Sequence, residues 1–113
     1  MKLAVIGLKE FSDYEKLKST LDKIEEISQI ISGGAPGTDT LAKKYAQEND
    51  IAFLEFPPGF HKYGKDAKHI RDKLIVENCD KIIAFYDGKC EGTKYTLDYG
   101  KKLGKQIIII EIV

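Results

Sequence analysis

Five short runs of apolar residues recur along the chain, and each is rich in isoleucine, valine or phenylalanine. They occupy residues 3–6, 27–31, 51–54, 82–85 and 107–112. Most of the runs are continuous rather than alternating, which is typical of strands in a parallel sheet whose two faces are both covered. The sequence therefore predicts five buried strands.

A stretch with helical spacing of its apolar residues follows each of the first four runs, with Lys and Glu on the opposite face. These residues are Tyr14, Leu17, Leu21 and Ile24; Leu41, Ala42, Tyr45 and Ala46; Ala67, Ile70, Leu74 and Ile75; and, more weakly, Thr96, Tyr99, Gly100 and Leu103. Strict alternation of strand and helix predicts a Rossmann-like α/β fold, with three α/β/α layers and a five-stranded parallel sheet.

One connection does not fit this alternation. Residues 55–65 run for about eleven positions without a clear period, whereas loops in α/β units usually have about 2–6 residues. Two interpretations stay open: a packed surface loop, or a lid or pocket wall beside a ligand, since ligands collect at the carboxyl ends of parallel strands.

Length and composition narrow the class of protein. A chain of 113 residues predicts a single domain over residues 1–113, and 42% hydrophobic residues predict a real core. Lys plus Arg and Asp plus Glu number 18 each. The resulting net charge of zero argues against broad nucleic-acid binding, which usually needs a basic surface.

The cysteines and the termini indicate a cytoplasmic protein without a membrane partner. Two cysteines, Cys79 and Cys90, are too few for a disulfide scaffold, and we expect both to be reduced thiols. No signal peptide is visible, and the apolar run at 107–110 is too short to cross a bilayer. The two histidines and two cysteines have no recognised zinc spacing, so we expect no metal and no cofactor.

A glycine-rich loop joins the second predicted strand to the second predicted helix. Its sequence is Ser32-Gly33-Gly34-Ala35-Pro36-Gly37-Thr38-Asp39. Glycines let a phosphate approach the backbone closely, and Pro36 fits the first turn of a helix. Free amides of that turn, together with the helix dipole, then favour an anion, to which Thr38 would add a hydroxyl donor.

The spacing of this loop matches neither the dinucleotide fingerprint nor the classical phosphate loop. Asp39 would repel a phosphate, so two roles for it stay open: it caps backbone amides, or it contacts a ribose hydroxyl. A tight turn without any ligand is the simpler alternative for the whole loop.

Further candidates lie at the same edge of the predicted sheet. Gly92 and Thr93 follow the fourth strand near the expected start of the fourth helix, and Gly7 and Lys9 follow the first strand. The basic residues of 62–71, with Arg71 among them, would attract phosphate or simply form a solvated helix face.

Four segments together resemble the SLOG superfamily, and most closely its small, single-domain YspA-like members. They are Val5-Ile6-Gly7 with Asp13-Tyr14; Ile31 to Asp39 with Leu41-Ala42 and Tyr45-Ala46; Tyr63-Gly64-Lys65 with Ala67 and Ile70-Arg71; and Asp80 to Phe85 with Gly92-Thr93. The resemblance implies a Rossmann-like fold that binds nucleotides. It implies a first binding loop at Gly33, Gly34, Gly37, Thr38 and Asp39, a second at Gly92 and Thr93, and Arg71 facing the ligand.

The chain departs from these relatives at several positions. Where they usually carry Gly-Ser-Arg it has Gly7-Leu8-Lys9, and where they carry Arg-Asn it has Arg71-Asp72. The phosphoribohydrolase branch carries a glutamate where this chain has Thr96, which removes a carboxyl group from the expected place. No nucleophile constellation is visible, and we assign no catalytic residue.

Three functions follow, in descending order of support. The first is binding or sensing of a nucleotide or nucleotide-derived phosphate ligand through two glycine-rich loops at helix N-termini. The second is cleavage of the N-glycosidic bond of a nucleoside monophosphate. The third is binding of single-stranded nucleic acid, as in the DNA-uptake relatives. Because related proteins often assemble, we also consider a homodimer.

Overall fold

Five parallel strands form one sheet at the centre of the protein. The computed structural model describes residues 1–112, apart from the side chains of Phe60 and His61. The strands are β1 (Lys2–Gly7), β2 (Gln29–Ser32), β3 (Ala52–Glu55), β4 (Lys81–Tyr86) and β5 (Gln106–Glu111). Their order in the sheet is β3-β2-β1-β4-β5, and every neighbouring pair is parallel.

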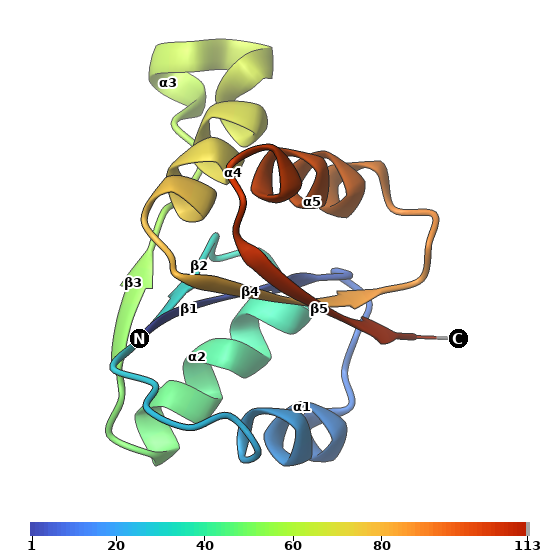
Figure 1. Cartoon of the computed structure of the whole chain (residues 1–113). Helices are drawn as coiled ribbons and strands as arrows, with labels where there is room; N and C mark the ends of the chain where they lie inside the picture. The colour runs from blue at the N-terminus through green and yellow to red at the C-terminus, as the bar shows by residue number, and fades with distance from the viewer. Residues whose placement is uncertain (113) are drawn as a thin grey trace.

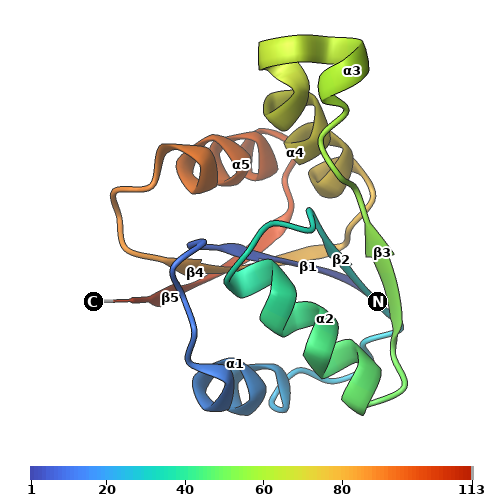
Figure 2. The same cartoon turned by 180° about the vertical axis from the view of Figure 1, so that it is seen from behind.

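Helices cover both faces of this sheet, as Figures 1 and 2 show from opposite sides. Helices α1 (Tyr14–Leu21) and α2 (Thr38–Glu48) lie on one face, and helices α4 (Ala67–Glu77) and α5 (Glu91–Lys102) lie on the other. The predicted Rossmann-like three-layer fold is therefore confirmed. In the part of the chain that the structure describes, no helix has the length and apolar character needed to cross a membrane.

The core lies on both sides of the sheet because successive side chains of a strand point to opposite faces. Leu3 and Val5 of β1 belong to the cluster under α1 and α2, whereas Ala4 and Ile6 belong to the cluster under α4 and α5. All four side chains are buried. This double coverage explains why the strands appear in the sequence as continuous apolar runs.

Two local expectations need correction. The fourth predicted helix begins at Glu91 rather than near Thr93, and Pro36 lies before the start of α2 rather than in its first turn. The segment 55–65 is also less irregular than expected. It contains a short helix, α3 (Phe60–Tyr63), and the start of a 3-10 turn (Gly64–Asp66) that runs into α4. Helical elements of three or four residues are too short to show a periodic pattern of apolar residues in the sequence.

The strand order creates a crevice between β1 and β4. From β1 the chain continues through α1 on one face of the sheet, whereas from β4 it continues through α5 on the other face. The two connections diverge at the carboxyl ends of these neighbouring strands. Open α/β sheets bind their ligands at such a switch point.

Candidate functional site

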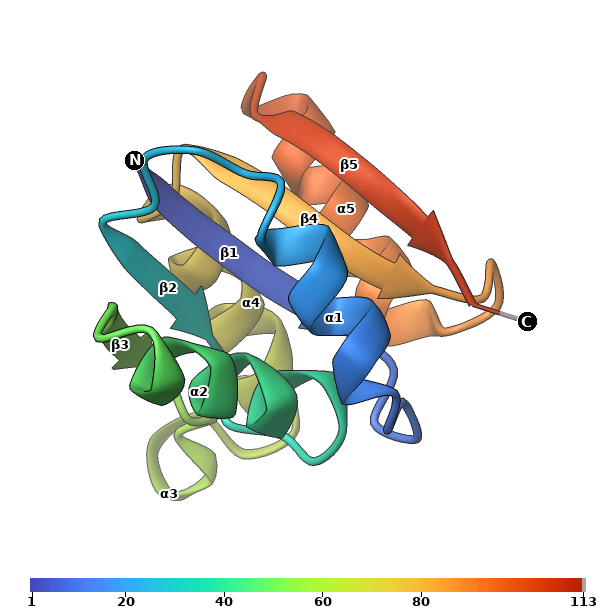
Figure 3. The ribbon, with the colours of Figure 1, turned by 90° about the horizontal axis from the view of Figure 1, so that it is seen from below.

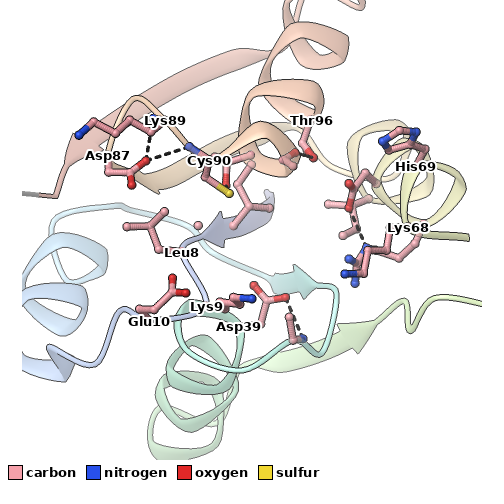
Figure 4. Close-up of a pocket in the computed structure, with 18 residues that line it drawn as sticks. Leu8, Lys9, Glu10, Asp39, Lys68, His69, Asp87, Lys89, Cys90 and Thr96 are labelled. Atoms are coloured by element: carbon pink, nitrogen blue, oxygen red, sulfur yellow. Dashed lines mark hydrogen bonds and ion pairs between the residues drawn. The ribbon is translucent and has the colours of Figure 1, made fainter. Parts of the chain in front are cut away.

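A cleft of about 530 Å³ lies at this switch point. Figure 4 shows its wall, which is built from the end of β1, the loops that follow β1, β2 and β4, helix α4, and the starts of α2 and α5. The side of α4 that faces it contributes Lys68, His69, Arg71, Asp72 and Ile75. The start of α5 contributes Gly92, Thr93 and Thr96.

The candidate residues from the sequence divide into two groups. Those that line the cleft are Gly7, Lys9, Asp39, Arg71, Gly92 and Thr93. Those that do not line it are Ser32 at the end of β2, Gly33, Gly34 and Gly37 in the β2–α2 loop, and Thr38 at the start of α2. Of the residues predicted from the sequence, only the first group therefore faces the cleft.

The β2–α2 loop is held closed by Asp39. The Oδ2 atom of Asp39 accepts hydrogen bonds from the amides of Gly33, at 3.2 Å, and Ala35, at 3.1 Å. Of the two roles left open for this residue, the structure shows the amide cap. Burial raises the pKa of the Asp39 carboxyl, although the Ala35 amide and the charge of Arg71 act in the opposite direction.

The mouth of α2 is occupied by the loop that follows β1. The amide and the hydroxyl of Thr38 both donate to the carbonyl of Leu8, at 3.1 and 2.9 Å. A Cβ atom on Gly37, which has a φ of 76°, would lie 2.3 Å from the carbonyl oxygen of Lys9. The sequence predicted unpaired amides and a free hydroxyl here. That expectation is corrected for the amides of Gly33, Ala35 and Thr38 and for the Thr38 hydroxyl.

Arg71 connects this loop to α4. Its Nη1 donates to the carbonyl of Gly33 at 2.8 Å, and its Nε is 2.7 Å from Oδ1 of Asp72. The two side chains of this ion pair are only 11% and 12% exposed. A Cβ atom on Gly33 would lie 2.2 Å from Nη1 of Arg71. Only a glycine at this position therefore leaves room for the guanidinium.

The mouth of α5 is open, in contrast to that of α2. Asp87 turns the preceding loop by accepting hydrogen bonds from the amides of Lys89 and Cys90, at 2.8 and 3.0 Å. Cys90 precedes the first turn and makes no capping bond with its side chain. Within the described chain, the amides of Glu91, Gly92 and Thr93 have no protein acceptor. A Cβ atom on Gly92 would find no atom within 4 Å.

Residues 1–63 match the sequence model of the YspA, cpYpsA-related SLOG family, YAcAr. The chain belongs to this SLOG family. The resemblance noted in the sequence is thereby confirmed, and membership suggests nucleotide-related binding or processing. No curated protein gives a significant sequence match.

The fold of this SLOG protein is also found in a solved structure of DNA processing protein A (DprA) from Streptococcus pneumoniae. The two superpose with a TM-score of 0.84 at 19% sequence identity. The comparison covers 99% of this chain and 50% of the other, so the SLOG chain spans about half the length of that relative. At this identity the likeness shows the fold.

The cleft of the SLOG protein carries balanced charge. Basic side chains from four positions line it: Lys9, Lys68, Arg71 and Lys89. Acidic side chains from as many positions do so too: Glu10, Asp39, Asp72 and Asp87. The sequence marked Lys9, Arg71 and Asp39 as site residues, and Lys68 only as part of a basic cluster. Glu10 and Lys89 were missed: Lys89 follows Gly88 in the second glycine loop, whereas Glu10 lies three positions after Gly7 and carries no motif of its own.

Proposed function

We propose that the cleft binds a nucleotide or a nucleotide-derived phosphate ligand, and that its phosphate lies at the first turn of α5. The observation that carries this proposal is the set of unpaired amides of Glu91, Gly92 and Thr93 beside the cleft. Such amides, together with the positive end of the helix dipole, stabilise an anion.

The neighbouring side chains support the same position for the phosphate. Lys89 lies just before the first turn of α5, and Lys68 and Arg71 line the same cleft from α4. Gly7 ends β1, and a Cβ atom there would lie 2.5 Å from the carbonyl oxygen of Phe85. The glycine keeps the floor between β1 and β4 flat. In this proposal Lys9 and Asp39 form the opposite wall, and the β2–α2 loop supports that wall rather than cradling the phosphate.

Substitution of Gly92 tests the position of the phosphate. Gly92→Asp sets a carboxylate among the amides, and we expect it to weaken binding of AMP or ADP-ribose at least about tenfold because like charges repel. Gly92→Asn has nearly the same shape without the charge, so it is the matched control. Both variants should fold, since the added Cβ atom meets open space.

Binding is measured by titration calorimetry and by thermal shift with AMP, ADP-ribose, NAD and cyclic nucleotides. If the native protein responds to none of them at millimolar concentration, the proposal fails. If Gly92→Asp binds as tightly as Gly92→Asn, the cleft still binds the nucleotide but the phosphate lies elsewhere.

Cleavage of the N-glycosidic bond is a second candidate function. Thr96 stands where the related phosphoribohydrolases carry a glutamate, but Asp39 and Asp72 bring carboxyl groups to the same cleft. Burial raises the pKa of both carboxyls, which is the direction that brings a carboxyl closer to the pH at which general acid–base catalysis is efficient. Incubation with AMP followed by chromatography tests this: release of free adenine supports an enzyme, and intact AMP supports a binding module.

A further inference from the structure

Helices α4 and α5 lie side by side on one face of the sheet, behind it in the view of Figure 3. Near the starts of the two helices, the imidazole of His69 on α4 stacks on the phenol ring of Tyr95 on α5. Their ring centroids are 4.0 Å apart, and the ring planes differ by 16°. His69 is exposed, whereas Tyr95 is half-buried. Tyr95 therefore supports the imidazole from one side and sets the plane of its ring.

This stack of two rings ends at the cleft. His69 lines the cleft and Tyr95 does not, so the imidazole lies between the tyrosine ring and the space in which we place the ligand. Among the described residues of the cleft wall, His69 alone has an aromatic side chain. Nucleobases stack on aromatic side chains because every base has a π face. His69 is therefore the surface of the wall that suits a base.

The position of this ring along α5 matches the reach of a nucleotide. The proposed phosphate site is at the first turn of α5, around Gly92, and Tyr95 is three residues farther along the helix. Three residues of an α-helix rise about 4.5 Å, a distance that one ribose spans. In Figure 4, Thr96 lies between Cys90, at the start of α5, and His69. A nucleotide with its phosphate at Gly92 can pass Thr96 and bring its base to His69.

We propose that the imidazole of His69 binds the base of the nucleotide, and that Tyr95 positions the imidazole for this contact. The opposite end of the cleft, at Asp87 and Lys89, is charged and offers no ring, so the base turns toward α4. A purine covers more of the imidazole than a pyrimidine does, and the site therefore prefers purine nucleotides. The inference rests on the proposed function and adds to it the place and the class of the base.

A pair of ligands separates the base from the phosphate. Ribose 5-phosphate has the sugar and the phosphate of AMP but no base. We expect the native protein to bind AMP about tenfold more tightly than ribose 5-phosphate, because one stacked base contributes about that factor. UMP should bind with an affinity between the two. NMR titration measures the three dissociation constants, weak ones included.

Three substitutions of His69 separate stacking from polar contacts. Phe keeps an aromatic ring without the ring nitrogens, Gln keeps a polar side chain without the ring, and Ala removes both. We expect His69→Phe to bind AMP about as tightly as the native protein, and His69→Gln and His69→Ala to bind it about tenfold more weakly. All three should bind ribose 5-phosphate as the native protein does. Because His69 is exposed, all three should fold, which circular dichroism checks.

Substitution of Tyr95 tests its positioning role. Tyr95→Leu removes the ring that supports the imidazole, and we expect it to weaken AMP binding while ribose 5-phosphate binds as before. Tyr95→Phe keeps the ring and should bind AMP like the native protein. A merely structural role of the tyrosine would weaken both ligands alike.

The outcomes separate this inference from the proposed function. If His69→Ala binds AMP like the native protein, the inference is overturned, and the phosphate site, which Gly92→Asp tests, stands. If His69→Ala loses AMP and ribose 5-phosphate equally, His69 acts on the phosphate or on the fold, and the inference is again overturned. If the native protein binds no nucleotide, the proposed function fails and this inference fails with it.

Discussion

The carboxylate of Asp39 is buried and also accepts hydrogen bonds from two loop amides. Burial raises the pKa of this carboxyl, whereas the hydrogen bonds lower it. Burial is the larger effect, so the pKa of Asp39 is raised above its ordinary value. In the folded protein its ionised form therefore costs free energy. That cost is present at neutral pH and disappears as the pH falls through the folded-state pKa, where the carboxyl is protonated in the folded chain before the unfolded one.

Replacement of Asp39 separates the hydrogen bonds from the charge. Asn keeps an oxygen that accepts from the amides of Gly33 and Ala35, so we expect Asp39→Asn to be as stable as the native protein, or more stable, at pH 7. Asp39→Ala loses the cap and should cost about 1–2 kcal/mol. Urea denaturation measures both. Between Asn and native protein, the difference in unfolding free energy should shrink from pH 7 toward pH 4. A difference that grows would contradict the raised pKa.

Arg71 shows how far a single position can be predicted from sequence. The resemblance to the SLOG superfamily implied that it faces a ligand, its basic charge suited that role, and it does line the cleft. Its bond to the carbonyl of Gly33 joins residues 38 positions apart, and no local pattern contains such a partner. The guanidinium therefore also holds the loop in place, which residue type alone did not indicate.

At the scale of elements, the strands and the four main helices followed from periodicity, and the contacts between loops did not. The β2–α2 loop was expected to expose its amides because its sequence resembles a phosphate cradle. The carbonyl of Leu8, from the β1–α1 loop, instead accepts both donors of Thr38. That acceptor comes from a segment without periodicity, so its place depends on how β1 and α2 pack, which the sequence pattern does not specify.

Two glycines at the ends of helices test whether this loop contact matters. Both have positive φ, 76° at Gly37 and 72° at Gly104, which costs an alanine at least about 1 kcal/mol; the ψ of −122° at Gly37 lies outside the left-handed helical region and adds to that cost. At Gly37 the new Cβ atom would also collide with the backbone of Lys9, whereas at Gly104 it meets nothing within 4 Å. We expect Gly37→Ala to cost about 3 kcal/mol or more and Gly104→Ala about 1 kcal/mol. If urea denaturation shows the same loss of unfolding free energy for both variants, the β1–α1 loop moves aside to accommodate the new Cβ atom, and the contact does not matter.

At the scale of the whole molecule, the position of the cleft follows from the order of the strands. Alternation of strand and helix predicted a parallel sheet covered on both faces, and both are confirmed. The strand order decides that the connections after β1 and β4 diverge beside each other. Lys9, Arg71 and Gly92 line the same cleft there, although in the sequence they belong to three separate segments.

The charge balance of the whole chain favours a mononucleotide over a polynucleotide as the ligand. Acidic and basic residues balance over the chain, at 18 each, and the cleft repeats that balance. One phosphate needs only the amides at α5 and a nearby cation. A single-stranded nucleic acid needs a continuous basic surface. The logarithm of its binding constant falls with the logarithm of the salt concentration by a slope of about −0.7 for each phosphate neutralised.

We therefore expect no gel shift of a single-stranded oligonucleotide at physiological salt, under conditions in which a mononucleotide raises the melting temperature of the protein. An oligonucleotide that binds there with a steep salt slope would mean that a basic track exists outside the cleft, and that the balanced charge of the cleft does not define the ligand.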